Sequence, residues 1–118
     1  MIMRAWILAG VIMTCAVGTA SAQYDLASAG SALPKCKIYA EKKQSMTTQD
    51  TIFFSECYGK LYGIIYYFGN QICYPKNVNL EQHAAIIVKY IEERPTLWHL
   101  NFFAVAEEAL KQAWPCNR

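Results

Sequence analysis

The stretch Ile52–Phe68, IFFSECYGKLYGIIYYF, decides the fold of this chain. Bulky apolar residues recur in it every three or four positions, which is the spacing of one face of an α-helix. The stripe consists of Phe54, Cys57, Tyr58, Leu61, Ile65 and Phe68. Further apolar residues flank it, so we expect a helix in the middle of a bundle, with partners on several sides. A strand is the alternative, because IIYYF is rich in β-formers, but the stripe exceeds a usual strand of about 5–6 residues.

Two glycines interrupt this helix, Gly59 and Gly63, four residues apart and therefore on one face. Each costs about 1 kcal/mol relative to Ala in a helix interior. We therefore expect another backbone to pack closely against them as compensation. Glu56 and Lys60 also break the apolar run. This leaves far fewer than the ~20 apolar residues that a membrane span needs, and we expect no span in the mature chain.

Residues 1–22 have the pattern of a secretory signal peptide. Arg4 supplies the positive start, Ala5–Val17 forms an apolar core, and an A-x-A sequence ends at Ala22. We predict cleavage after Ala22, which leaves 23–118 as a single small domain. Cys15 offers a lipoprotein alternative, which the bulky residues just before it do not favour.

Four cysteines remain after cleavage: Cys36, Cys57, Cys73 and Cys116. An even number in a small exported chain predicts two disulfides. A zinc site is the alternative, but the chain has no C-x-x-C pair and its two histidines are isolated in sequence. We therefore expect no metal and no cofactor.

Helix geometry selects the pairing of these cysteines. Cys57 and Cys73 lie about 24 Å apart if a helix joins them, whereas a disulfide needs Cα atoms within roughly 7 Å. Cys36 and Cys57 are nearly equidistant from a polar turn at 44–48, so an antiparallel hairpin brings them together. Cys73 precedes and Cys116 follows the last two helices, whose outer ends meet if they are antiparallel. We predict Cys36–Cys57 and Cys73–Cys116.

Three more helices are expected around the first. After a frayed lead-in at 23–33, Pro34 opens a short helix at Lys35–Lys43. A third helix starts after Asn79 and stops before Pro95, and a fourth runs over His99–Ala113. The predicted fold class is all-α, a small disulfide-bonded bundle of about four helices. The residues expected to face inward are Leu80, Ala84, Ile87 and Ile91 on the third helix, and Phe103, Ala106, Leu110 and Ala113 on the fourth.

The helix ends carry recognisable capping residues. Thr48 or Asp50 can cap the long helix at its start, and Gly69-Asn70 favours a left-handed residue at its end. Asn79 and Gln82 have the spacing of a capping box. A pair at Glu107 and Lys111 has the spacing of an exposed helical ion pair.

No catalytic signature is present. A dyad of Cys57 with His83 or His99 is excluded if the cysteine is oxidised, and His83 is expected at the surface. Phosphate-binding loops and hydrolase motifs do not occur. Eleven Lys and Arg balance nine Asp and Glu without a basic run, so nucleic acid is not expected as a partner. We expect a protein that is not an enzyme.

A bulky connection, Thr96–Leu100 (TLWHL), joins the last two predicted helices. In one interpretation its leucines tuck under the bundle and Trp98 covers the end. In the other, Trp98 and His99 are displayed as anchors for a partner, a role in which Trp is common. Both stay open. The same choice, core or subunit interface, applies to Tyr58, Tyr62, Tyr66 and Tyr90.

Several motif pieces in order link 54–116 to a known family. They are Cys57-x-Gly59-x-x-x-Gly63, Cys73-x-Pro75-x-x-Val78-x-x-x-Gln82, Tyr90-Ile91 with Pro95, Ala109-Leu110, and Pro115-Cys116. This pattern resembles the Tai-type (amidase immunity) family of the bacterial type VI secretion system. Lys60 stands where that family usually has Tyr, and the N-terminal third matches only through Cys36.

The resemblance implies a disulfide-bonded periplasmic protein that binds and blocks a peptidoglycan amidase effector, and it implies a homodimer. It assigns partner binding to the connection that plugs the amidase cleft. Here that connection is Arg94, Pro95, Thr96, Leu97, Trp98 and His99. Because the motif residues support the fold and not the partner, alternatives remain: an exported helical structural or chaperone-like protein without an amidase partner, and a small-ligand carrier that uses the groove beside Gly59 and Gly63.

Overall fold

The computed structural model describes residues 25–42 and 44–117. Within these ranges the chain forms α1 (Ala29–Glu41), α2 (Thr48–Phe68), α3 (Leu80–Glu92), the 3-10 turn η1 (Pro95–Leu97) and α4 (Phe102–Ala113), with no β-strand. The predicted all-α class and the helical interpretation of 52–68 are confirmed. The predicted signal peptide lies outside the described residues.

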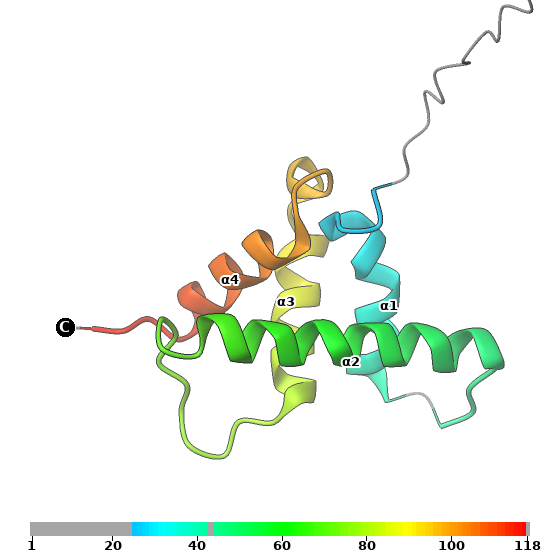
Figure 1. Ribbon diagram of the computed structural model, residues 1–118, viewed down its shortest axis with the longest axis horizontal. Coiled ribbons are helices and arrows are strands. Elements are labelled where there is room, and N and C mark those ends of the chain that lie inside the picture. Colours follow the sequence, from blue (N-terminus) through cyan, green and yellow to red (C-terminus); the bar gives the residue numbers. More distant parts are fainter. Residues whose placement is uncertain (1–24, 43, 118) are drawn as a thin grey trace, which may run out of the picture.

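The longest helix, α2, lies across the bundle and not in its middle (Figure 1). α1 packs against both α2 and α3, and α3 packs against α4. Only Cys57, Leu61 and Ile64 of α2 are buried, so the expected central position is wrong. A helix of 21 residues is about 31 Å long, and three helices of 12 or 13 residues do not surround it. Tyrosines on its other faces tolerate water through their hydroxyl groups.

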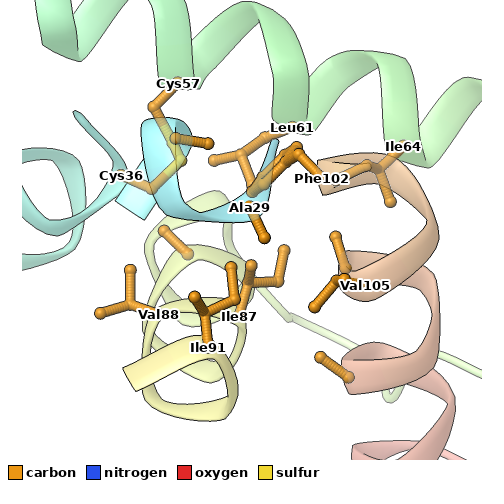
Figure 2. Packing of buried hydrophobic residues seen from close by; sticks show 14 of the residues in the cluster. Ala29, Cys36, Cys57, Leu61, Ile64, Ile87, Val88, Ile91, Phe102 and Val105 are labelled. Atoms are coloured by element: carbon orange, nitrogen blue, oxygen red, sulfur yellow. A yellow bond between two sulfur atoms is a disulfide. The ribbon is translucent and has the colours of Figure 1, made fainter. Parts of the chain in front are cut away.

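The hydrophobic core lies where the four helices meet, as the converging side chains in Figure 2 show. Phe102, in the first turn of α4, is the largest fully buried side chain. The stripe predicted on α3 is confirmed for the buried residues Ala84, Ile87 and Ile91, with Leu80 packed at its edge. The buried residues of α4 are Phe102, Val105, Ala106, Ala109 and Leu110.

The predicted inward face of α4 was therefore correct for Ala106 and Leu110 and wrong for Ala113, which is exposed. Of two adjacent phenylalanines, Phe102 enters the core and Phe103 is half-buried. The helix begins at Phe102 and not at His99, because residues 95–97 form the 3-10 turn first. Because Phe102 and Phe103 are equally hydrophobic, the sequence pattern alone does not show which of the two side chains faces the core.

The predicted frayed lead-in is wrong, because α1 begins at Ala29, six residues before the expected start. The Ser28 side chain caps it by accepting a hydrogen bond from the Ser31 amide at 3.2 Å. Ala29 and Ala32 are completely buried, since their small side chains let α1 approach its neighbours closely. Pro34 lies inside the helix and not in its first turn.

The caps of the other helices are partly as predicted. Thr47, and not Thr48 or Asp50, is the residue that caps α2. Asp50 completes a capping box, because its carboxylate accepts a hydrogen bond from the Thr47 amide. The Asn79–Gln82 capping box is confirmed, with hydrogen bonds of 2.9 and 3.2 Å. Gly69 has a φ of −53°, so the expected left-handed end is wrong. Glycine is nevertheless required at this position for steric reasons, because a Cβ at residue 69 would lie only 2.6 Å from the Ile65 carbonyl oxygen.

Both predicted disulfides are confirmed. Cys36–Cys57 joins α1 to α2 with Cα atoms 5.0 Å apart, and Cys73–Cys116 joins the middle of the α2–α3 connection to the C-terminal segment at 5.1 Å. Cys36 and Cys57 are completely buried. Cys73, by contrast, is exposed.

The two glycines of α2 do not form the expected backbone contact. A Cβ built at Gly59 meets nothing within 4 Å, and one built at Gly63 meets the Phe103 ring at 3.2 Å. The partner of Gly63 is thus a side chain, and Gly59 faces open space. Within residues 25–42 and 44–117, no helix is long and apolar enough to cross a membrane.

This difference between the glycines predicts opposite effects on stability. Gly63→Leu should lower the free energy of unfolding by about 1–3 kcal/mol, because it overpacks against Phe103. Gly59→Ala should raise it by up to ~1 kcal/mol through helix propensity. Urea unfolding of both variants measures this, and equal destabilisation by the two changes would contradict the described packing.

The disulfides should differ in their ease of reduction. Under limiting dithiothreitol without denaturant, we expect alkylation to label Cys73 and Cys116 before Cys36 and Cys57, because reduction requires access to the sulfur atoms. Peptide mapping of the labelled protein measures the order. Simultaneous labelling of all four cysteines would mean that the bundle opens as one unit.

Candidate functional site

The candidate site is the connection between α3 and α4, residues 94–101, here called the connecting loop. It begins at Arg94, whose guanidinium carbon lies 3.8 Å from the centre of the Tyr90 ring. Arg94 Nη1 also donates to the Tyr90 carbonyl at 3.2 Å and lies 3.7 Å from the Glu93 carboxylate. These contacts hold the first residue of the loop against the last turns of α3.

The loop is a series of tight turns. The Leu97 amide donates to the Arg94 carbonyl at 3.0 Å, Trp98 to Pro95 at 3.2 Å, and Leu100 to Leu97 at 3.0 Å. Pro95 starts the 3-10 turn, a position where the fixed φ of proline is compatible with helical geometry. The main chain of the loop is therefore ordered by its own hydrogen bonds.

Trp98 combines features of both sequence interpretations. The residue is 41% exposed, as expected of an anchor for a partner. Its indole Nε1 nevertheless donates to the Ile91 carbonyl at 2.8 Å, across the end of α3. His99, Pro95 and Thr96 are exposed, whereas Leu97 is half-buried. The loop thus displays a bulky aromatic side chain whose orientation is restrained by a hydrogen bond.

The start of α1 holds the loop from the other side. The Gly30 amide donates to the Trp98 carbonyl at 2.9 Å, and the Ala29 amide donates to the Leu100 carbonyl at 2.7 Å. In return, the Phe102 amide donates to the Ala27 carbonyl at 2.7 Å. Sequence reasoning missed this contact because it is made by main-chain atoms, which carry no residue-specific signal.

An apolar pocket of about 250 Å³ lies directly beside the loop. It is lined by Tyr90, Leu97, Leu100, Ala104, Val105 and Glu108. Leu100 is 40% exposed, so apolar surface continues from the pocket onto the loop. The groove expected beside Gly59 and Gly63 is not part of this pocket.

The carboxylates near the loop are engaged in ion pairs. Glu92 lies 2.8 Å from Lys37 of α1, and its hydrogen bond and negative charge raise the pKa of the Lys37 ammonium. Glu93 lies 4.0 Å from Lys89. Farther along α4, the predicted Glu107–Lys111 pair is present at 2.6 Å. These glutamates serve as surface ion-pair partners and not as an acid–base pair.

His83 is buried and not at the surface, contrary to the sequence prediction. Its Nδ1 lies 2.7 Å from the Asn79 carbonyl oxygen, and its ring packs 4.9 Å from that of Tyr74 and 5.3 Å from that of Trp114. Burial raises the pKa of the Tyr74 phenol. This aromatic cluster packs beside the Cys73–Cys116 disulfide and has a structural role.

The remaining motif residues are structural. Gln82 completes the cap of α3, and Pro75 and Pro115 are exposed neighbours of the Cys73–Cys116 disulfide. Lys60 places its ammonium group 5.9 and 6.0 Å from the ring centres of Phe102 and Phe103. A cation over these aromatic faces is a favourable contact.

Three tyrosines form a second exposed surface, on α2. Tyr58, Tyr62 and Tyr66 are 42%, 51% and 85% exposed and lie four residues apart, so they share one side of the helix. The core interpretation is wrong for these three, whereas Tyr90 is half-buried. We call Tyr58, Tyr62 and Tyr66 the tyrosine face.

Among the described residues, no group of three His, Cys, Asp or Glu side chains could hold a metal ion. Comparison with known protein families gives further information on the function of the chain. A family model for the Rap1a immunity proteins matches residues 28–116.

The chain belongs to the Rap1a immunity protein family. The match begins at Ser28, the cap of α1, and ends at Cys116, so it includes every described helix and both disulfides. The match thus reaches the N-terminal part of the fold, which the motif pieces in 54–116 do not cover. An immunity protein family implies a secreted effector as the partner. No curated protein matches the chain, and no solved structure does.

Proposed function

We propose that this protein acts in the periplasm and blocks a peptidoglycan amidase that a type VI secretion system delivers. Membership in the Rap1a family supports the immunity role, and the narrower resemblance to the Tai-type proteins supports an amidase as the target. The two disulfides agree with an oxidising compartment such as the periplasm. Inhibition proceeds by stoichiometric binding and not by catalysis.

The observation that carries this proposal is the construction of the connecting loop. The loop projects from one end of the bundle (Figure 1), and Trp98 in it is 41% exposed while its indole is already hydrogen-bonded to Ile91. A rigid, exposed tryptophan loses little conformational freedom on binding. Such residues are enriched among those that dominate binding energy. The residues Arg94, Pro95, Thr96, Leu97, Trp98 and His99 insert into the amidase cleft.

We also propose that two copies of the chain associate through the tyrosine face. Tyr58 and Tyr62 pack edge to face with ring centres 4.8 Å apart, and Tyr66 packs in the same way on Tyr67 at 5.6 Å, so exposed aromatic rings cover this side of α2. The nearby charges are engaged elsewhere: Glu56 pairs with Lys35, and Lys60 lies over two phenylalanine rings. A self-complementary interface of this kind suits a symmetric dimer.

Trp98→Ala tests the role of the loop. The variant should fold, keep both disulfides and lose only about 1 kcal/mol of stability with the Ile91 hydrogen bond. Its affinity for the amidase should fall at least about thirtyfold, the loss of a central aromatic anchor. Arg94→Ala and His99→Ala should cause smaller losses. Calorimetric titration and thermal unfolding on the same preparations measure both quantities.

The matched control is Tyr67→Ala, which removes an aromatic side chain that is 74% exposed on α2 and should not change inhibition. If Trp98→Ala inhibits at full strength, the loop is not the inhibitory segment. A loss of several kcal/mol in stability, with binding reduced only through unfolding, would show that Trp98 is a structural residue.

Tyr66→Glu tests the dimer. A buried negative charge on each copy should convert the dimer to a monomer, as measured by sedimentation velocity, because an unpaired charge at an interface is costly. Ala85→Glu, an exposed position on α3, is the control and should leave the mass unchanged. A wild-type protein that is monomeric at all concentrations would end this part of the proposal.

A further inference from the structure

The segment Asp25–Ser31 is more ordered than its place at the start of the described chain suggests. The Ala27 amide donates to the Asp25 carboxylate at 2.9 Å, and the Ser28 amide donates to the Asp25 carbonyl at 3.1 Å. The Ser31 hydroxyl lies 2.9 Å from the Leu26 carbonyl oxygen and 3.0 Å from that of Ser28. Ser31 is 4% exposed. These bonds fold the segment into a compact turn that leads into the first turn of α1.

Main-chain atoms of this segment form hydrogen bonds with the connecting loop and with Phe102. Ala27 supplies one carbonyl to Phe102, while Ala29 and Gly30 supply amides to Leu100 and Trp98. Between these bonds, Ser28 and Asn101 form an isolated antiparallel bridge. The loop and the turn are thus paired like two short strands, at the end of the bundle where Figure 1 places η1 beside the start of α1.

Gly30 sets the distance between the two segments. A Cβ at this position would lie 3.1 Å from the Trp98 Cβ and 3.2 Å from the Trp98 carbonyl oxygen. A contact that close forces one of the segments to move by a few tenths of an ångström. Glycine at position 30 is therefore what permits the 2.9 Å hydrogen bond between its amide and Trp98.

We propose that Asp25–Ser31 is a positioning element for partner binding: it holds residues 98–102 in one conformation, and this conformation sets the affinity of the loop for its partner. The inference rests on the proposed function of the loop, but it assigns a role to residues that lie outside the loop. Ser31 and Gly30 act through the loop and not by touching the partner. Holding the loop before binding removes an entropy cost that a free loop would incur on association.

Two substitutions with matched controls test this proposal. Ser31→Ala removes the hydroxyl that closes the turn, and Ser55→Ala removes a hydroxyl on α2 that makes a similar 2.9 Å bond to a carbonyl, that of Thr51. Gly30→Ala introduces the close contact with Trp98, and Gly59→Ala introduces a methyl group into open space. Each pair makes the same chemical change inside and outside the positioning element.

The first measurement is amide hydrogen exchange on the free protein. In Ser31→Ala and Gly30→Ala we expect the amides of Ala29, Gly30 and Phe102 to exchange about tenfold faster or more, since local opening controls their protection. Amides of the α3 core should be unchanged, which separates loosening of the loop from general destabilisation. Neither control should speed up exchange at Ala29, Gly30 or Phe102.

The second measurement is affinity for the amidase. Ser31→Ala and Gly30→Ala should weaken binding by about three- to tenfold with little change in melting temperature, because only the ordering of the loop is lost. If exchange rises but affinity does not change, the positioning role is wrong. If exchange does not rise, the turn does not hold the loop and the inference is also wrong. If the unaltered protein binds no amidase, the proposed function fails, and the exchange measurement still decides whether Asp25–Ser31 holds the loop.

Discussion

The Cys36–Cys57 disulfide is the constraint on which the rest of the structure depends. α2 is the longest helix, yet only three of its residues are buried, with Phe54 and Phe68 packed at the edge of the core, and such a contact gives limited hydrophobic stabilisation for 21 ordered residues. The disulfide fixes this helix to α1 at a Cα–Cα distance of 5.0 Å, and in the chain-entropy description a loop of this size contributes about 3 kcal/mol. The ion pair of Lys35 with Glu56 lies one residue before each cysteine. Because α2 is held in this way, its opposite side can remain exposed.

The two proposed interfaces lie on separate elements. The connecting loop belongs to the α3–α4 junction and is supported by the start of α1, whereas the tyrosine face belongs to α2 alone. Phe102 links the two regions: its amide bonds to Ala27 beside the loop, and its ring packs in the core next to α2 under the Lys60 ammonium. The two proposed interfaces share no residue, because the connecting loop comprises 94–101 and the tyrosine face comprises Tyr58, Tyr62 and Tyr66.

Much of the architecture was predictable, and the reasons are local. The apolar spacing in 52–68 and the Asn79–Gln82 pair each depend on residues within one or two helical turns. The sequence pattern therefore correctly predicted the helix α2 and the capping box of α3. Of the three possible cysteine pairings, helix length excluded the one that contains Cys57–Cys73, and the expectation of antiparallel neighbouring helices selected between the other two. The predicted loop was also correct in place, since Pro95 and the bulky residues after it interrupt two clear helical patterns.

The errors concern residues whose surroundings come from distant parts of the chain. His83 is polar and near a helix start, yet Tyr74 and Trp114 enclose it. Gly59 and Gly63 look equivalent in sequence, but only Gly63 meets a side chain from α4. Small residues at 25–33 resemble a frayed end, because alanine, glycine and serine give no apolar stripe. Their order comes from main-chain bonds to residues 98–102.

Local composition and spacing thus determined the all-α class, the Asn79–Gln82 capping box and much of the choice of cysteine pairs, since these depend on atoms within a few turns or on the fixed length of a helix. The tertiary structure alone decided which side of α2 is covered, how far Trp98 is exposed and what holds the loop in place. The bonds that hold the loop join segments some seventy residues apart, and they are made by backbone atoms that every residue shares.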